Sequence, residues 1–133
     1  VAGIDQVRLH PDRDIAVSVL EGELPGCRTW PFSKNVRRGE DCMVIGHPHG
    51  FKEPRITTGV ISTRVQDAND VDIDLWHGGI FVVDADGEPG SSGSPVFNED
   101  GRVIGVLVGK WGDIIICIPY KEFQWFLESG YGG

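Results

Sequence analysis

Short apolar runs separated by turns rich in glycine and proline alternate along the chain as far as about residue 118. Such runs predict short β-strands joined by turns rich in glycine and proline, a pattern that agrees with a β-barrel. The sequence therefore predicts an all-β fold. The expected strands cover residues 3–10, 14–20, 41–45, 55–65, 80–84, 96–97, 102–108 and 114–118.

A different period appears after Pro119. Tyr120, Phe123, Phe126 and Leu127 recur at the three- and four-residue spacing that places side chains on one face of a helix. This pattern predicts an amphipathic C-terminal helix.

Residues 22–40 break the strand pattern and are polar, with prolines and glycines at several positions. Their length and composition suit a connection between two subdomains. Two aromatic residues in this segment, Trp30 and Phe32, are expected to hold it in place by packing.

The hairpin formed by the two strands before residue 21 has apolar side chains on both faces. A lone hairpin is marginally stable in water, and its exposed edges favour aggregation. We therefore expect further polypeptide to cover its apolar residues, which include Ile15, Val17, Val19 and Leu20.

Length, charge and hydropathy narrow the class of protein. The 133 residues suggest one compact domain, and a hydrophobic content of 40% suits a globular protein. The formal net charge of −8 argues against a nucleic acid or an anionic membrane as the partner, because both select a basic face. No apolar run is long enough for a membrane span.

The three cysteines, Cys27, Cys42 and Cys117, are odd in number and widely spaced. Neither a disulfide framework nor a C-x-x-C metal site is visible in this arrangement. We expect all three to be small buried apolar side chains.

The stretch from Gly87 to Phe97 concentrates glycine, proline and serine directly before an apolar strand. Gly90 allows a backbone conformation that a side chain would forbid, so its N–H can point into a pocket beside that of Ser92. Two such donors form an oxyanion hole, and Pro95 stiffens the exit from the loop. The alternative is an ordinary Ser/Gly turn between strands.

The run from Gly90 to Pro95, Gly-Ser-Ser-Gly-Ser-Pro, resembles the active-site loop of the chymotrypsin-like serine peptidases. The resemblance implies that Ser92 is the nucleophile and that the amides of Gly90 and Ser92 bind the oxyanion. Ser94 stands where many relatives have glycine, although glutamyl endopeptidases and several viral proteases also have serine there. The G-x-S-x-G elbow of α/β-hydrolases does not fit, because position 94 is not glycine.

Asp14 directly precedes the run Ile15-Ala16-Val17. On its own an aspartate at this position has the simple role of capping a turn. The sequence Asp-Ile-Ala-Val also resembles the way in which Deg/HtrA peptidases present the aspartate of their triad. The resemblance implies that Asp14 accepts a hydrogen bond from a histidine and fixes its tautomer.

Further stretches resemble the Deg/HtrA peptidases: Val36–Glu40, Ile45–Gly50 and Thr58–Ser62. The implied fold is a chymotrypsin-like double β-barrel, here the complete second barrel plus the last strands of the first, with a C-terminal helix. The implied divisions are residues 1–21 as the remnant of an N-terminal barrel, 22–40 as the linker between barrels, and 41–133 as the C-terminal barrel and helix.

The chain departs from that family at the catalytic histidine, which lies a few dozen residues before the aspartate in relatives. The four histidines, His10, His47, His49 and His77, do not match that motif, and none is assigned to the triad. One hypothesis is a serine endopeptidase that cuts polypeptides and whose base lies on an N-terminal fragment or chain outside this sequence. The alternative is a catalytically incomplete domain that binds peptides or assembles with a partner. The resemblance implies neither a metal nor an organic cofactor.

The resemblance also indicates a specificity pocket made by Asp86, Val108 and Lys110. Trypsin-like enzymes place an aspartate at the position of Asp86, which favours Lys or Arg before the cut bond. Deg/HtrA relatives instead prefer small aliphatic residues, and Lys110 would oppose Asp86 from the facing wall. Leu107 stands where glutamyl endopeptidases have a histidine, which argues against cleavage after Glu.

Three further patterns resemble ligand sites without completing one. His47 and His49 flank a proline but lack other ligands at zinc spacing. The aspartates within residues 66–74 lack the order of a calcium loop, so a solvated acidic loop is expected there. Residues 105–110 resemble a P-loop only superficially, because Trp111 stands where Ser or Thr would bind magnesium.

Overall fold

A computed structural model describes residues 3–11, 15–22, 25–27, 29–47, 52–68, 78–85, 92–112 and 114–129. For residues 3–6, 19 and 21 the description covers the backbone alone.

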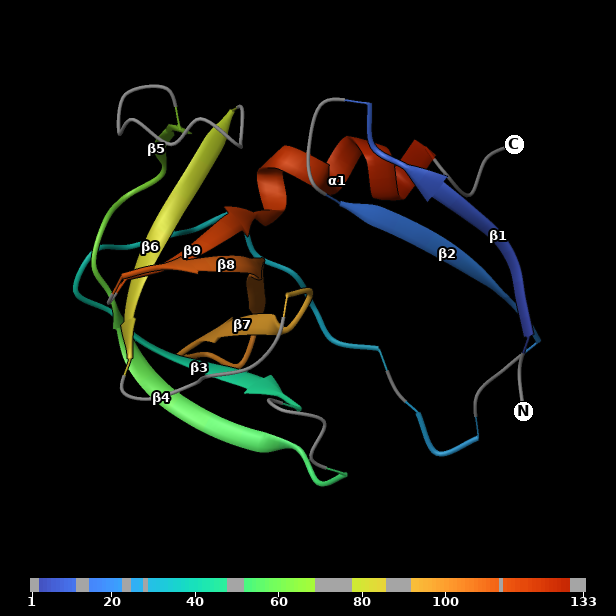
Figure 1. Ribbon diagram of the computed structural model, residues 1–133, viewed down its shortest axis with the longest axis horizontal. Coiled ribbons are helices and arrows are strands. Elements are labelled where there is room, and N and C mark those ends of the chain that lie inside the picture. The colour runs from blue at the N-terminus through green and yellow to red at the C-terminus, as the bar shows by residue number, and fades with distance from the viewer. Residues whose placement is uncertain are drawn as a thin grey trace.

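Six antiparallel strands close into a barrel (Figure 1). Their order is β4-β3-β7-β8-β9-β6, and β6 pairs back onto β4 through Gly59–Ala85, Val60–Asp84 and Ile61–Val83. A short strand, β5, extends the sheet beside β6. The bounds are β3 Asp41–Gly46, β4 Arg55–Ile61, β5 Gln66–Asp67, β6 Gly79–Ala85, β7 Pro95–Asn98, β8 Val103–Trp111 and β9 Ile114–Pro119.

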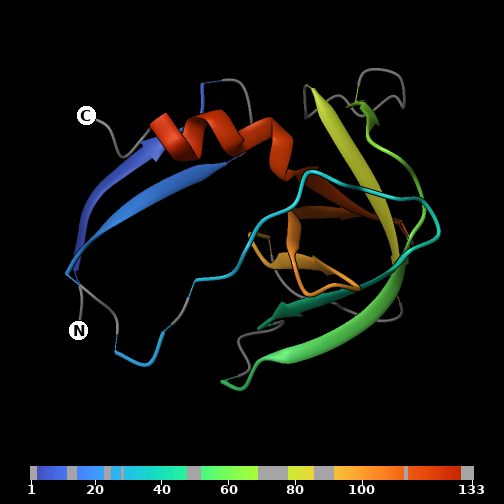
Figure 2. The same cartoon turned by 180° about the vertical axis from the view of Figure 1, so that it is seen from behind.

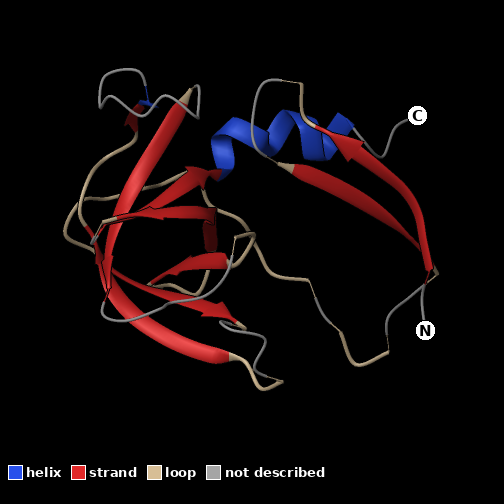
Figure 3. Ribbon diagram, in the orientation of Figure 1, coloured by secondary structure: helices blue, strands red, loops and turns tan. Residues whose placement is uncertain are grey.

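Two strands stand apart from the barrel as a separate sheet, β1 (Gly3–Leu9) and β2 (Ala16–Glu21). The single helix among the described residues, α1 (Tyr120–Ser129), continues from β9 and runs alongside this hairpin (Figure 3). The all-β fold with a barrel and a C-terminal helix is thus confirmed. No helix in the described part of the chain has the length and apolar character needed to cross a bilayer.

The core has two parts, one inside the barrel and one between the barrel and α1. The inner cluster centres on Phe81, Ile61 and Ile104, which are fully buried. The outer cluster includes Val108, Ile116 and Phe123, and Ile15 of the hairpin region packs against it. Burial of this outer apolar surface is what joins the hairpin to the barrel.

Some boundaries differ from those expected. The strand expected over 55–65 ends at Ile61, and the expected acidic loop begins instead with the strand Gln66–Asp67, which pairs with Ile80 and Gly79. β8 continues to Trp111 because Lys110 and Trp111 still pair with Ile115 and Ile114 of β9. The rest of that acidic loop, residues 69–74, lies outside the described residues.

The cysteine prediction is wrong for one residue of the three. Cys42 and Cys117 are buried, whereas Cys27 is exposed in the linker. Linker position, rather than residue type, decides this exposure. Burial raises the pKa of the Cys42 thiol to about 11, with Asp41 and Glu40 adding to the shift, and burial also raises the pKa of Cys117.

These environments predict that one thiol of the three reacts with a disulfide reagent in the folded protein at pH 8. Cys27 is exposed, whereas Cys42 and Cys117 are protonated at that pH and shielded. Thiol titration before and after unfolding should give one and then three groups. Rapid reaction of all three in the folded state would contradict the burial of Cys42 and Cys117.

A second prediction concerns the packing of α1. Phe123 is 4% exposed in the outer cluster, whereas Trp125 on the same helix is 67% exposed. Phe123→Ala should lower the free energy of unfolding by about 3–5 kcal/mol. Trp125→Ala is the matched control and should change it by about 0.5 kcal/mol or less. Urea unfolding measures both, and equal losses would show that α1 does not pack through Phe123.

Candidate active site

Ser92 lies just before β7, in a turn whose exit is fixed to β8 by backbone hydrogen bonds. The amide of Gly93 donates to Leu107 O at 2.7 Å, and the amide of Leu107 donates to Ser94 O at 2.9 Å. Gly93 has a φ of 92°, a left-handed conformation that favours glycine at this position. The conformation of Gly93 and the two backbone hydrogen bonds to Leu107 thus fix the turn that presents Ser92.

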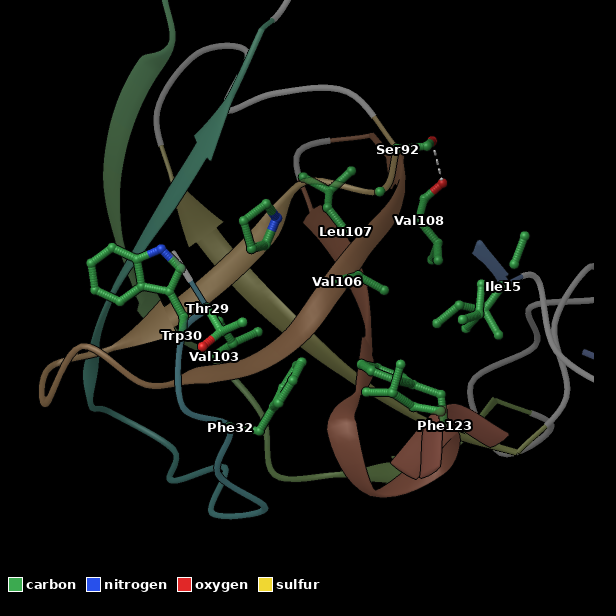
Figure 4. Close-up of a pocket in the computed structure, with 15 residues that line it drawn as sticks. Ile15, Thr29, Trp30, Phe32, Ser92, Val103, Val106, Leu107, Val108 and Phe123 are labelled. Atoms are coloured by element: carbon green, nitrogen blue, oxygen red, sulfur yellow. Dashed lines mark hydrogen bonds between the residues drawn. The ribbon is translucent and has the colours of Figure 1, made fainter. Parts of the chain in front are cut away.

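The hydroxyl of Ser92 is exposed to the surface of this turn and donates a hydrogen bond of 2.8 Å to the carbonyl of Val108 (Figure 4). The pairing of β8 with β9 shifts register between Leu107 and Gly109, so Val108 forms a bulge in the ladder. An amide carbonyl accepts a hydrogen bond but cannot take up the proton. In this arrangement the hydroxyl is held in position without being activated.

An apolar cavity of about 650 Å³ opens beside Ser92. Segments distant in sequence line it: the start of β2, the linker, β7, β8 and α1 (Figure 4). Its volume lies in the range of sites that take small molecules or side chains. The lining residues are Ile15, Ala16, Val17, Thr29, Trp30, Phe32, Ser92, Gly93, Pro95, Val103, Val106, Leu107, Val108, Phe123 and Leu127.

Aromatic contacts fix the hairpin to α1 on one side of the cavity. The ring of His10 meets Phe126 edge-on, with centroids 4.9 Å apart, and the Arg8 guanidinium carbon lies 5.6 Å from the same ring. The backbone amide of His10 donates to Ile15 O at 3.0 Å. The start of β2, and with it the wall of the cavity, is thereby held close to the helix.

The linker is anchored on the other side, as the sequence indicated for Trp30 and Phe32. Trp30 packs edge-on against Phe97, with centroids 5.6 Å apart. Phe32 stacks on Tyr120 at 4.3 Å and forms a bridge to Val103 of β8. Burial, and secondarily Glu128, raises the pKa of Tyr120.

The hairpin is covered on one face only. Ile15 and Val17 are half-buried at the cavity, which α1 of the same chain helps to enclose. Further polypeptide is therefore needed to cover only part of the apolar surface of the hairpin. Val7, Leu9 and Leu20 are exposed, Leu9 to 77%. Exposed apolar groups gathered on one small sheet are typical of a surface that another polypeptide covers.

Several residues singled out from the sequence, Asp14, Asp86, Gly90, His49 and His77, lie outside the described residues. Ile15, which follows Asp14 directly, lines the same cavity as Ser92.

Two of the three residues predicted to form the specificity pocket, Val108 and Lys110, are described, and they lie in different surroundings. Val108 is buried in the outer cluster and lines the cavity, whereas Lys110 is exposed and does not line it.

The described histidines do not approach the serine. His10 packs on Phe126, and His47 is exposed after β3; neither lines the cavity. Among the described residues no group of His, Cys, Asp and Glu could hold a metal ion.

Sequence reasoning missed two kinds of participant in this site. Thr29, Phe123 and Leu127 form cavity walls although they lie far from the Ser92 loop in sequence. Helical spacing identified Phe123 and Leu127 as a buried face but not what they face. The Ser92 hydroxyl donates to a backbone carbonyl. Every residue has such a carbonyl, so the residue type at position 108 could not have predicted this hydrogen bond.

The sequence of this chain is similar to those of known peptidases. The family model described as "Trypsin-like peptidase domain" matches residues 4–106. The mitochondrial serine protease HTRA2 of Bos taurus is 32% identical over 92% of this chain and 27% of its own length. A probable periplasmic serine endoprotease DegP-like from Rickettsia prowazekii is 36% identical over 70% of this chain and 18% of its own length. The chain thus spans about a quarter or less of these relatives.

Solved structures share the fold. The Rv3671c protease of M. tuberculosis in its active form superposes with a TM-score of 0.74 and 23% identity, covering 96% of this chain and 57% of that one. The HtrA-type protease AlgW with a decapeptide gives a TM-score of 0.73 and 23% identity, over 94% of this chain and 41% of that one. The chain belongs to the trypsin-like peptidase family, and the relatives it resembles are serine proteases of the Deg/HtrA type.

Proposed function

We propose that this chain carries the nucleophile of a serine endopeptidase, with Ser92 attacking the peptide carbonyl. The observation that supports this most is the position of the Ser92 hydroxyl beside a cavity that Ile15 also lines, directly after Asp14. A base placed in that cavity would lie beside Ser92 and beside Ile15, the residue that follows Asp14 in the sequence.

In the proposed reaction a histidine takes the proton from Ser92 Oγ as that oxygen bonds to the substrate carbonyl carbon. The amides of Gly90 and Ser92 stabilise the resulting oxyanion. The imidazolium returns the proton to the leaving amine, and water then releases the acyl group by the same steps. Asp14 fixes the tautomer of the imidazole and stabilises its charged form.

We further propose that the histidine comes from a polypeptide segment outside this sequence, which also covers the hairpin. The exposed side chains of Val7, Leu9 and Leu20 support this, since burying each would contribute about 1.5–3 kcal/mol. On this proposal residues 1–21 complete an N-terminal barrel, 22–40 link the two barrels, and 41–133 form the C-terminal barrel and helix. Such a partner must displace the Val108 carbonyl from Ser92.

One observation favours the alternative of a catalytically incomplete domain. The Ser92 hydroxyl is bonded to a carbonyl that cannot accept its proton, and neither described histidine lies at the cavity. A domain that only binds peptides could retain this arrangement. The substrate class is the same in both cases, a polypeptide, and the related protease AlgW has a structure with a decapeptide.

A fluorophosphonate probe applied to the protein as it occurs in its cell tests the proposal. We expect one adduct, mapped to Ser92, because the probe reacts with an activated serine hydroxyl. Ser92→Ala should abolish the adduct and lower peptide turnover on the order of a million-fold, with unchanged unfolding. The exposed Ser18 provides the control, since Ser18→Ala should keep both. A folded wild-type protein that forms no adduct would support the binding module instead.

The primary specificity is proposed from Asp86, Val108 and Lys110. An aspartate at the base of the pocket favours Lys or Arg before the cut bond, whereas the exposed Lys110 opposes that preference. Leu107 is buried in the inner cluster, and cleavage after Glu is not expected. Cleavage of a peptide library should show the basic preference, and Asp86→Ala should remove it. A profile with no basic preference would eliminate the role of Asp86.

A further inference from the structure

The linker passes along the start of β8 (Figure 2). A second cleft, polar in character, lies between the linker and the turn that joins β7 to β8. Its volume is about 280 Å³, enough for one side chain or a small anion. Ser33, Asn35 and Arg37 line it from the linker, and Asn98 and Arg102 line it from the turn. The proposed peptidase chemistry uses none of these residues.

Backbone hydrogen bonds hold the two walls together. The amide of Ser33 donates to Val103 O, and the amide of Val103 donates to Pro31 O, both at 2.9 Å. Glu40 Oε1 accepts from the amide of Glu99 at 3.3 Å. The cleft is therefore a feature of the fold, formed by a linker that pairs with the edge of β8.

Asn98 lines this cleft, and as a residue it is only 8% exposed. Its Oδ1 accepts the amides of Asp100 and Arg102, both at 3.0 Å, which fixes the orientation of the side-chain amide. No residue in the described ranges accepts a hydrogen bond from its Nδ2. The Nδ2 atom itself is open to the cleft, since it is not among the buried side-chain atoms that lack a partner, and it can donate to an acceptor on a ligand there.

Arg37 and Arg102 add two guanidinium groups, and within the described part of the chain neither has an ion-pair or side-chain hydrogen-bond partner. Guanidinium groups match the two oxygens of a carboxylate and form its strongest hydrogen bonds. The neighbouring Arg38 is exposed and does not line the cleft.

Charge distinguishes among possible anions. Glu40 and Asp100 also line the cleft, so the formal charges of its two acidic and two basic side chains sum to zero. Two nearby carboxylates repel a dianionic phosphate more strongly than a monoanion. Phe32, 37% exposed, offers an apolar surface for the carbon chain next to a bound carboxylate.

We propose that this cleft is a carboxylate-binding site that takes an acidic group of a peptide, held by Arg37, Arg102 and Asn98 Nδ2. It lies across Phe32 from the cavity beside Ser92, since that ring lines both. The site thus offers a second point of attachment for a polypeptide, separate from the Ser92 hydroxyl. Its occupancy does not depend on the protein being a peptidase.

The first test is titration by NMR at low salt, observing the Arg Nε and Asn Nδ2 signals of the whole chain. N-acetylglutamate N-methylamide should shift the signals of Arg37, Arg102 and Asn98, with a dissociation constant on the order of 1–10 mM. The neutral glutamine analogue is the matched control and should shift none. N-acetylalanine presents a terminal carboxylate, and its tighter binding would assign the site to a peptide C-terminus. Tighter binding of inorganic phosphate than of either carboxylate would overturn the proposal.

Variants locate the site. Arg37→Gln and Arg102→Gln should each weaken binding about tenfold or more, the loss expected for a hydrogen bond between ions. Asn98→Asp keeps the oxygen that accepts the amides of the turn but replaces the Nδ2 donor by an anion, so it should abolish binding in a folded protein. Arg38→Gln should leave affinity unchanged. An equal loss in Arg38→Gln, or no saturable shift in the wild type, would overturn the proposal.

Discussion

The backbone bonds between the Ser92 turn and β8 are the constraint on which the rest of the site depends. Gly93 donates to Leu107, and Leu107 donates to Ser94, so the turn moves only if the barrel does. Leu107 itself is buried in the inner cluster, so the turn is bonded to a residue that is anchored in the core of the barrel. A serine held in this way keeps its position whatever binds beside it, which is the preorganisation that transition-state stabilisation requires.

The cavity beside that serine is made by contacts between distant parts of the chain. Phe126 holds the hairpin through His10 and Arg8, while Tyr120 holds the linker through Phe32. One short helix thus positions both walls. Within the described part of the chain the Ser92 hydroxyl donates to Val108 O, a carbonyl that orients it but cannot take up its proton.

Much of the fold follows from local patterns in the sequence, and much of the site does not. Alternating apolar runs and turn residues predict the barrel strands, and the spacing of Tyr120, Phe123 and Phe126 predicts α1. The Ser92 loop is visible because Gly93 and Pro95 are needed for its backbone conformation. Each of these signals can be recognised from neighbouring residues alone, because it depends on the conformational preference of the residue types involved.

The remaining features depend on what the folded chain brings together. Cys27 is exposed because it lies in the linker, although its residue type is most often buried. The short strand β5, Gln66–Asp67, which pairs with β6, consists of polar residues and has the composition of a loop. The polar cleft brings together Arg37 and Arg102, which are 65 positions apart, through the parallel contact between Phe32 and Val103 and the bond from the Glu99 amide to Glu40.

An experimental structure of the protein as it occurs in its cell tests the central claim most directly. The account predicts an imidazole nitrogen within about 3 Å of Ser92 Oγ, the reach that proton transfer needs. The other ring nitrogen should donate to Asp14, and the Ser92 hydroxyl should no longer be bonded to Val108 O. A cavity filled by side chains without an imidazole, with Ser92 still bonded to that carbonyl, would contradict the account.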